Sequence, residues 1–380
     1  MSDARTGLIG IVVFFTAFGT RLVGIAVTSL TTLNPYAQAD AERFAASAAE
    51  TAATIAAGQL PQIPMDPNRI VTLWGLFLSP LWLLPGPNRL YGRMFSAVLG
   101  AFAVYLLYRL GRSLYSAEAG VIAALPLVTF PSYVFVHSSI LREAFVLIGV
   151  VGIPTLLLTR EWTPRRQVFR YLLAAAALGL ITAVRWENMP LYLLTLITAI
   201  AVHHCRALPR ARLAAVVVGL TSLVTAVLAH SAVRSGLDFF IVKRQRRNHG
   251  RTVYLPEFLP NTIPKAMAFT PVGAIYFLFT PFPWMVETMA DVVVFLEALL
   301  NLVAFGLALV GVPVLWHRSK AVTAALVTGF LAGVVLYGLV NANVGTSVRQ
   351  RQMFLWVVFL FAGAAVAERC DVGRYLRRSR

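Results

Sequence analysis

The chain has 380 residues, of which 58% are hydrophobic and 13% charged, and its mean hydropathy is +0.73. Soluble domains are about 45–50% apolar and about 25% charged, so a soluble protein of this size would lack the polar residues to cover its core. The net charge of +17 comes mainly from arginines spread along the chain, which argues against a nucleic-acid-binding domain and favours contact with anionic lipid.

Apolar runs near 20 residues recur along the whole sequence, and a run of about 20 residues crosses a bilayer as a helix. We therefore expect an all-α integral membrane protein that forms one polytopic domain over residues 1–380. No small-residue cleavage motif closes the first run, so we expect a retained helix rather than a signal peptide. About ten spans are predicted, at residues 8–28, 91–111, 117–136, 140–159, 170–184, 188–204, 212–233, 287–315, 321–340 and 352–368.

Residues 70–84 form a shorter apolar run that contains a proline, Trp74 and Trp82. It is too short to cross a bilayer comfortably, and tryptophan favours the membrane interface. We predict that this segment lies on the outer membrane surface.

The basic residues are distributed unevenly between the two sides that these spans define. The later short segments predicted to be cytoplasmic hold 16 arginines and lysines, and the opposite short loops hold 4. The positive-inside tendency then predicts cytoplasmic termini in a cell-membrane protein. It also places two long segments, residues 29–90 and 234–286, outside as the first and second outer loops.

Motifs for soluble cofactors are missing from the sequence. It contains no nucleotide-binding glycine loop and no His-Glu-x-x-His or Cys-x-x-Cys motif, and neither Cys205 nor Cys370 has metal-ligand spacing. We expect no cofactor, no metal and no nucleic-acid partner.

Two acids in the first outer loop could carry chemistry. Asp40 and Glu42 stand about ten residues beyond the first predicted span, at the start of an alanine-rich stretch. A carboxylate at a helix start is often only a cap. The alternative is a general base, which would take a proton from an attacking hydroxyl or amine.

Four arginines and two glutamates lie at predicted outer helix ends. Such residues near the bilayer usually have partners, so Arg–Glu pairing within each short loop is the simpler interpretation. The arginines nevertheless outnumber the acids, and a guanidinium fork suits phosphate oxygens. The arginines are Arg142, Arg185, Arg349 and Arg351, and the glutamates are Glu143 and Glu187.

The second outer loop opens with a basic cluster. A solvated loop or a lipid-headgroup contact explains it most simply, and capture of an anionic acceptor or donor headgroup is the alternative. The cluster consists of Lys243, Arg244, Arg246, Arg247 and His249.

The order of residues in the first half resembles the GT-C superfamily of glycosyltransferases, which use polyprenyl-phosphate sugars. In that family an Asp in the first outer loop precedes an Arg and an aromatic, as Asp40, Arg43 and Phe44 do in DAERF, and the second span opens with an Arg, as Arg93 does here. The resemblance covers about residues 5–190 and, more loosely, NVGTSVRQR near the C-terminus. It differs in that Ala41 separates two acids that the family commonly has side by side.

The resemblance implies transfer of a sugar from a polyprenyl-phosphate carrier to an envelope lipid, glycan or protein at the non-cytoplasmic face. Asp40 would be the base, with Glu42 as the second candidate, and no metal would be required. A lipid or solute transporter or flippase, or a non-catalytic scaffold of envelope assembly, are the alternatives. The arginines implied to hold the donor phosphate are Arg93, Arg142, Arg185, Arg349 and Arg351.

Overall fold

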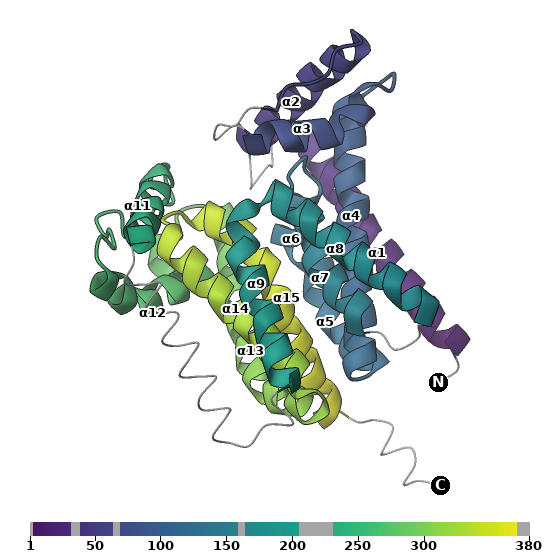
Figure 1. The fold of residues 1–380 in the computed structure, drawn as a ribbon, viewed down its shortest axis with the longest axis vertical. Helices are drawn as coiled ribbons and strands as arrows, with labels where there is room; N and C mark the ends of the chain where they lie inside the picture. Colours follow the sequence, from purple (N-terminus) through teal and green to yellow (C-terminus); the bar gives the residue numbers. More distant parts are fainter. Residues whose placement is uncertain (1–2, 32–38, 64–68, 159–163, 205–230, 371–380) are drawn as a thin grey trace. The chain divides into compact units, whose positions relative to one another are not determined.

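The computed structural model describes residues 3–31, 39–63, 69–158, 164–204 and 231–370. These residues fold into helices, and the β-structure among them is one isolated bridge between Val253 and Asn343 (Figure 1). The predicted all-α class is therefore confirmed. The helices are α1 (Asp3–Leu30), α2 (Ala39–Ala56), α3 (Arg69–Trp82), α4 (Asn88–Leu114), α5 (Ala117–Thr129), α6 (Pro131–His137), α7 (Glu143–Leu158), α8 (Pro164–Val184), η1 (Trp186–Asn188), α9 (Met189–His204), α11 (Ser231–Arg246), α12 (Ile263–Phe279), η3 (Pro283–Met285), α13 (Met289–Arg318), α14 (Lys320–Val340) and α15 (Val344–Arg369).

Several helices are suited to crossing a bilayer, which makes this a multi-pass membrane protein. Within the described residues, five are long and apolar enough, namely Gly7–Leu30, Asn88–Leu114, Met289–Arg318, Lys320–Val340 and Val344–Arg369. Two bent pairs, α5 with α6 at 67° and α8 with α9 at 119°, raise the number to seven if each pair is one span.

The expected ten spans are not all present as separate long helices. The 16 residues of α7 extend about 24 Å, less than the about 30 Å of a bilayer core. The expected span at 212–233 lies largely outside the described residues. Ten spans therefore stay a prediction.

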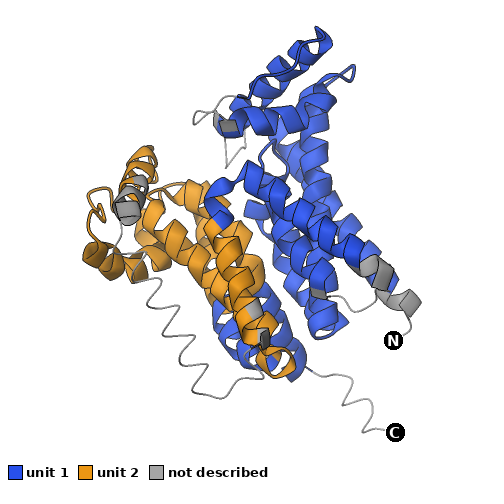
Figure 2. Ribbon diagram, in the orientation of Figure 1, with its two compact units in different colours: residues 1–189, 304–314, 358–380 blue, residues 190–303, 315–357 orange. Residues whose placement is uncertain are grey.

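The chain divides into two compact units that interleave in sequence (Figure 2). Unit 1 comprises residues 1–189, 304–314 and 358–380, and unit 2 comprises residues 190–303 and 315–357.

Unit 1 is built around α4, which packs against α1, α5 and α7. Small residues let these helices approach closely. A Cβ added to Gly120 of α5 would lie 3.0 Å from the backbone nitrogen of Arg112, and one added to Gly111 of α4 would lie 2.7 Å from the Cα of Gly120. Close backbone approach of this kind is how helices associate where lipid removes the hydrophobic drive between them.

A buried arginine donates to the backbone carbonyl that is left without a donor at the break between α5 and α6. Pro131 has no N–H to donate to the carbonyl of Leu127, which would otherwise continue the helix. The side chain of Arg21, on α1, donates from Nη2 to that carbonyl at 3.0 Å and contacts Nδ1 of His137 at 3.2 Å. Both side chains are fully buried. Gly100 makes room for them, since an added Cβ would lie 2.6 Å from Nε of Arg21.

Side chains also donate to backbone carbonyls at the break between α6 and α7. Arg93 of α4 donates from Nε to the carbonyl of Ser138 at 2.9 Å, and Trp74 of α3 donates to the carbonyl of Ile140 at 3.2 Å. Trp74 is fully buried beside Phe145, so it anchors α3 in unit 1. The indole N–H of Trp74 therefore serves an interior carbonyl, and the location of residues 70–84 at the outer membrane surface stays a prediction.

In unit 2, α12 packs on α14, where a Cβ on Gly273 would lie 2.6 Å from the carbonyl oxygen of Gly338. Arginines again meet helix ends. Arg351 of α15 donates to the carbonyls of Leu278 and Thr280 at 3.0 and 2.7 Å, where α12 ends. Breaks in unit 2 therefore depend on side-chain donors as those in unit 1 do.

We predict that Arg21→Gln lowers the stability of the protein by about 1–3 kcal/mol, because a buried carbonyl and an imidazole nitrogen lose their donor. The stability of Arg21→Lys should lie between those of the wild type and Arg21→Gln, since an ammonium keeps the charge without the planar fork. Thermal unfolding of the purified protein in lipid nanodiscs is the measurement. The control is Arg246→Gln, at an exposed arginine. Equal melting temperatures for the Arg21 and Arg246 variants would contradict the capping role.

Candidate functional site

The two candidate acids lie in the first turn of α2, which packs along α3, where the hydroxyl of Ser47 donates to the carbonyl of Val71 at 3.3 Å. Asp40 is half-buried. Glu42 is 66% exposed and forms a two-pronged pair with Arg89 in the first turn of α4, with N–O distances of 2.7 and 3.1 Å. The structure therefore gives Glu42 a cationic partner at the start of α4.

Arg93 lies near the start of α4, as predicted, but its donors face the protein. Besides Ser138, it donates to the hydroxyl of Ser29 at 2.7 Å, to the hydroxyl of Thr28, and to the carbonyl of Ile25 at 3.3 Å. Arg93 thus joins the end of α1 to the α6–α7 break. Phosphate binding by Arg93 stays a prediction.

Four charged residues predicted at outer helix ends of unit 1 converge. Arg185 lies 3.6 Å from Glu143 and 3.7 Å from Glu187, and Arg142 lies 3.9 Å from Glu187. Arg142 also donates to the carbonyl of Val184, the last residue of α8, at 2.7 Å. We call these four residues the charge cluster.

The ion pairs of the charge cluster join residues of different loops, and they are more buried than pairing between neighbours in sequence suggested. Arg185 pairs with Glu187 as the simple interpretation had it, but it also reaches Glu143 on α7, and the acid beside Arg142 is Glu187. Arg185 and Glu143 are 1% and 0% exposed. Two arginines and two glutamates leave no formal excess of charge among these four residues.

The remaining two outer arginines belong to unit 2, near the start of α15. Arg351 is buried and bonded to carbonyls at the end of α12, and Arg349 is half-buried. Convergence of these two with Arg142 and Arg185 on one donor site stays a prediction.

The basic cluster of the second loop splits into inward and outward side chains. Arg244 is buried, and its guanidinium carbon Cζ lies 4.9 Å from the centroid of the Phe269 ring. It donates to the carbonyls of Phe258, at 2.8 Å, and of Asn341. Burial lowers the pKa of Arg244. Arg247 donates to the side chains of Asn341 and Gln350.

The structure thus uses Arg244 and Arg247 to hold loop 255–258 and the end of α14. Arg246 and His249 are exposed, and Lys243 is half-buried. Headgroup or acceptor contact stays a prediction, best suited to the exposed members.

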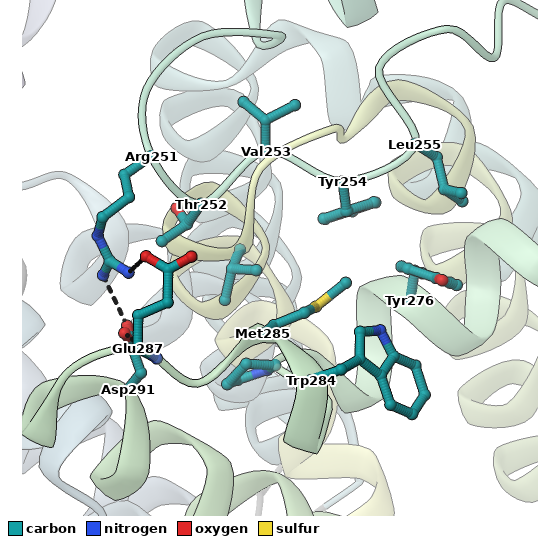
Figure 3. Close-up of a pocket in the computed structure, with 12 residues that line it drawn as sticks. Arg251, Thr252, Val253, Tyr254, Leu255, Tyr276, Trp284, Met285, Glu287 and Asp291 are labelled. Atoms are coloured by element: carbon teal, nitrogen blue, oxygen red, sulfur yellow. Dashed lines mark hydrogen bonds and ion pairs between the residues drawn. The ribbon is translucent and has the colours of Figure 1, made fainter.

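Unit 2 contains a cavity of about 300 Å³ between the loop 251–255 and the segment 281–287 (Figure 3). One side carries Tyr276 and Trp284, and Met285 lies between them and a charged side. Two backbone hydrogen bonds fix the first loop to the α14–α15 connection, from the N–H of Tyr254 to Ala342 at 2.9 Å and from the N–H of Val344 to Thr252 at 3.0 Å.

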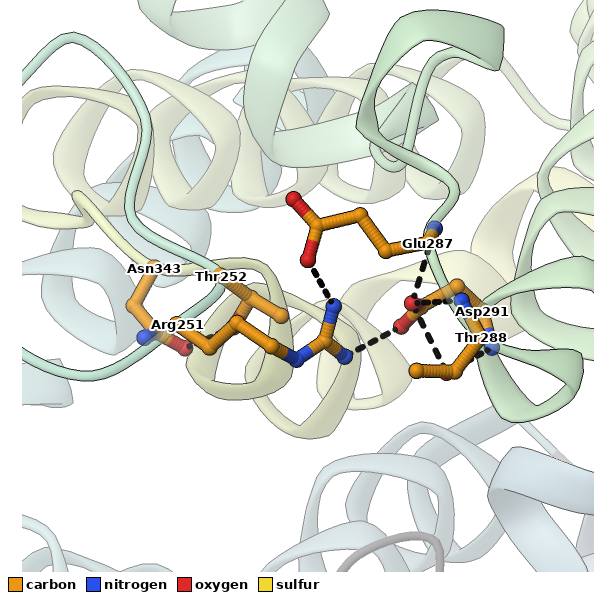
Figure 4. A network of polar contacts seen from close by, with 6 residues as sticks. All are labelled: Arg251, Thr252, Glu287, Thr288, Asp291 and Asn343. Carbon is orange, nitrogen blue, oxygen red and sulfur yellow. Dashed lines mark hydrogen bonds and ion pairs between the residues drawn. The ribbon is translucent and has the colours of Figure 1, made fainter.

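The charged side of the cavity is a network around Arg251 (Figure 4). Arg251 donates to Glu287 at 2.9 Å and to Asp291 at 2.8 Å, and these bonds raise its pKa. Asp291 also accepts from the backbone and hydroxyl of Thr288, which closes a capping box at the start of α13. Arg251 therefore ties the 251–255 loop to the segment that carries Glu287 and Asp291.

Sequence reasoning missed this cavity and the Arg21–His137 pair. The signal for Arg21 was a lone cation inside an apolar run, followed a hundred residues later by a proline that frees a carbonyl. The cavity had a weaker signal, because its aromatic and charged residues come from separate segments. Among the described residues, no group of three or more His, Cys, Asp or Glu side chains could hold a metal ion.

No protein-family model matches this sequence, and no curated protein is similar enough to count as a match.

We predict that the Arg185–Glu143 pair is structural. Arg185→Met should destabilise the protein by about 3–5 kcal/mol, because it removes the cation beside the buried Glu143 carboxylate. Glu143→Met should destabilise it less, because Arg185 keeps Glu187 at 3.7 Å. The double variant should be less destabilised than Arg185→Met alone. Additive losses in thermal unfolding would mean that the two residues are not coupled. The exposed pair offers the control, since Arg89→Gln and Glu42→Gln should each change stability little.

Proposed function

We propose that this protein is a membrane glycosyltransferase that moves a sugar from a polyprenyl-phosphate carrier to an envelope acceptor at the non-cytoplasmic face. The observation that carries the proposal is the position of Asp40. It is half-buried and stands in the first turn of α2, the helix that follows the first long apolar helix. This is where the GT-C resemblance expects the base.

The proposed reaction is a single displacement. An acceptor oxygen or nitrogen attacks the anomeric carbon of the sugar and loses its proton to the carboxylate of Asp40. The bond between that carbon and the phosphate oxygen breaks, and polyprenyl monophosphate leaves with the electron pair. The sugar is therefore transferred with inversion. Cationic donors beside the phosphate would stabilise the charge that develops on it.

The arginines proposed to bind that phosphate are Arg93, Arg142, Arg185, Arg349 and Arg351. Intramolecular contacts support a preorganised arrangement, since a guanidinium that is already held pays less entropy when it meets a ligand. A phosphate at Arg142 would compete with Glu187, which lies 3.9 Å away with a geometry looser than a hydrogen bond. We therefore rank Arg142 above the deeply buried Arg185.

We predict that Asp40→Asn abolishes transfer, because the amide keeps the shape of the side chain and removes its basicity. The loss should be about 100- to 10,000-fold, the usual contribution of a general base. The measurement is release of polyprenyl monophosphate from polyprenyl-phosphate mannose, glucose and aminoarabinose by protein in nanodiscs. The matched control is Glu42→Gln, which should lose little activity because Glu42 is exposed and paired with Arg89. Full activity in Asp40→Asn would remove the proposed mechanism.

We predict that both termini are cytoplasmic and that α2 and the 234–286 loop face outward. In a Cys205→Ser background, cysteines introduced at the exposed positions Ala49 and Arg246 should react with an impermeant maleimide in intact cells. The native Cys370, exposed at the end of α15, should react only after permeabilisation. The opposite labelling pattern would invert the topology.

A further inference from the structure

The cavity of unit 2 has two chemically different walls. Tyr276 and Trp284 lie on one side, and Arg251, Glu287 and Asp291 on the other (Figure 3). Its volume of about 300 Å³ is at the small end of ligand pockets, which favours one or two rings over a lipid chain.

The aromatic wall is a supported row of rings. Phe282 stacks on Trp284 with centroids 4.8 Å apart and meets Tyr276 edge-on at 5.0 Å. Tyr276 in turn lies 5.1 Å from Tyr254. One face of the Trp284 indole is covered by Phe282 while the residue remains 73% exposed, so its other face is open to a ligand.

The deeper end of the aromatic row is neutral. Tyr254 is buried, its hydroxyl shares a hydrogen bond of 2.9 Å with Ser347, and burial raises its pKa to about 12. The phenol therefore stays protonated at physiological pH, and charge in the cavity comes from the opposite wall.

The charged wall offers donors and acceptors at fixed positions. Asp291 is saturated by Arg251 and Thr288, whereas Glu287 is 63% exposed and bonds Arg251 through one oxygen only (Figure 4). Its second oxygen can accept from a ligand hydroxyl, and the Arg251 guanidinium can donate to one. A cationic ligand would have to compete with Arg251 for both carboxylates.

We propose that this cavity binds a saccharide ring of the acceptor, an inference that rests on the proposed glycosyl transfer. A pyranose has an apolar C–H face, which would cover the open face of Trp284, and a rim of hydroxyls that both donate and accept. Trp284 and Tyr276 pack against the ring, and Glu287 and Arg251 form hydrogen bonds with its hydroxyls.

Saturation-transfer NMR on the full chain in lipid nanodiscs tests the proposal. The probes are methyl α-mannopyranoside, methyl β-glucopyranoside and methyl N-acetylglucosaminide. At least one should receive saturable transfer at its ring protons. Trp284→Ala should weaken that binding about tenfold, because it removes a stacking surface, and Trp284→Phe should restore most of it.

The matched control is Trp186→Ala, which removes an exposed tryptophan from unit 1 and should leave binding unchanged. Absence of saturable transfer to all three glycosides would overturn the proposal, as would equal binding by Trp284→Ala. Binding of choline in their place would assign the cavity to cations and also overturn it. Asp40→Asn should bind as the wild type does. A fully active Asp40→Asn protein would refute the proposed base without touching this result.

Discussion

A helix that breaks inside an apolar protein leaves backbone carbonyls without donors, and this fold satisfies them with side chains from other helices. Arg21 donates to the carbonyl of Leu127, and Arg93 donates to that of Ser138. Trp74 donates to the carbonyl of Ile140, and Arg351 donates to those of Leu278 and Thr280. Lipid offers no hydrogen bonds, so a bent span persists only where protein groups re-satisfy its backbone. The breaks in α5–α6 and α6–α7 are therefore as much a property of α1, α3 and α4 as of the broken segment.

Arginine suits this constraint better than lysine does. The sequence has 30 arginines and 3 lysines. A guanidinium presents five N–H donors in a rigid plane, so one side chain can serve two or three acceptors at fixed angles. Arg244 does so for Phe258, Leu255 and Asn341 together. An ammonium would meet fewer of these carbonyls, and it is more strongly hydrated.

Local pattern predicted most helices, because apolar runs and prolines act within a few residues. The sites were harder. Asp40 and Glu42 were chosen as candidates from their place after an apolar run, and their catalytic role stays a prediction. Nothing local indicates that Glu42 pairs with Arg89, 47 residues later. In the charge cluster, adjacency suggested Arg142 with Glu143, whereas the fold brings Arg142 to Glu187 and Arg185 to Glu143. Such partners depend on how α7 and α8 meet, which periodicity does not encode.

The Arg21 contact has a consequence for how the chain is made. A charged side chain in a lone apolar helix costs on the order of 2.5–3.5 kcal/mol to insert. The carbonyl that receives Arg21 lies 106 residues further along the chain. At about 5–20 residues per second, the ribosome needs about 5–20 s to deliver it. During that interval the first helix has to keep its guanidinium near water, lipid headgroups or the translocon, so its final seating waits for α5 and α6.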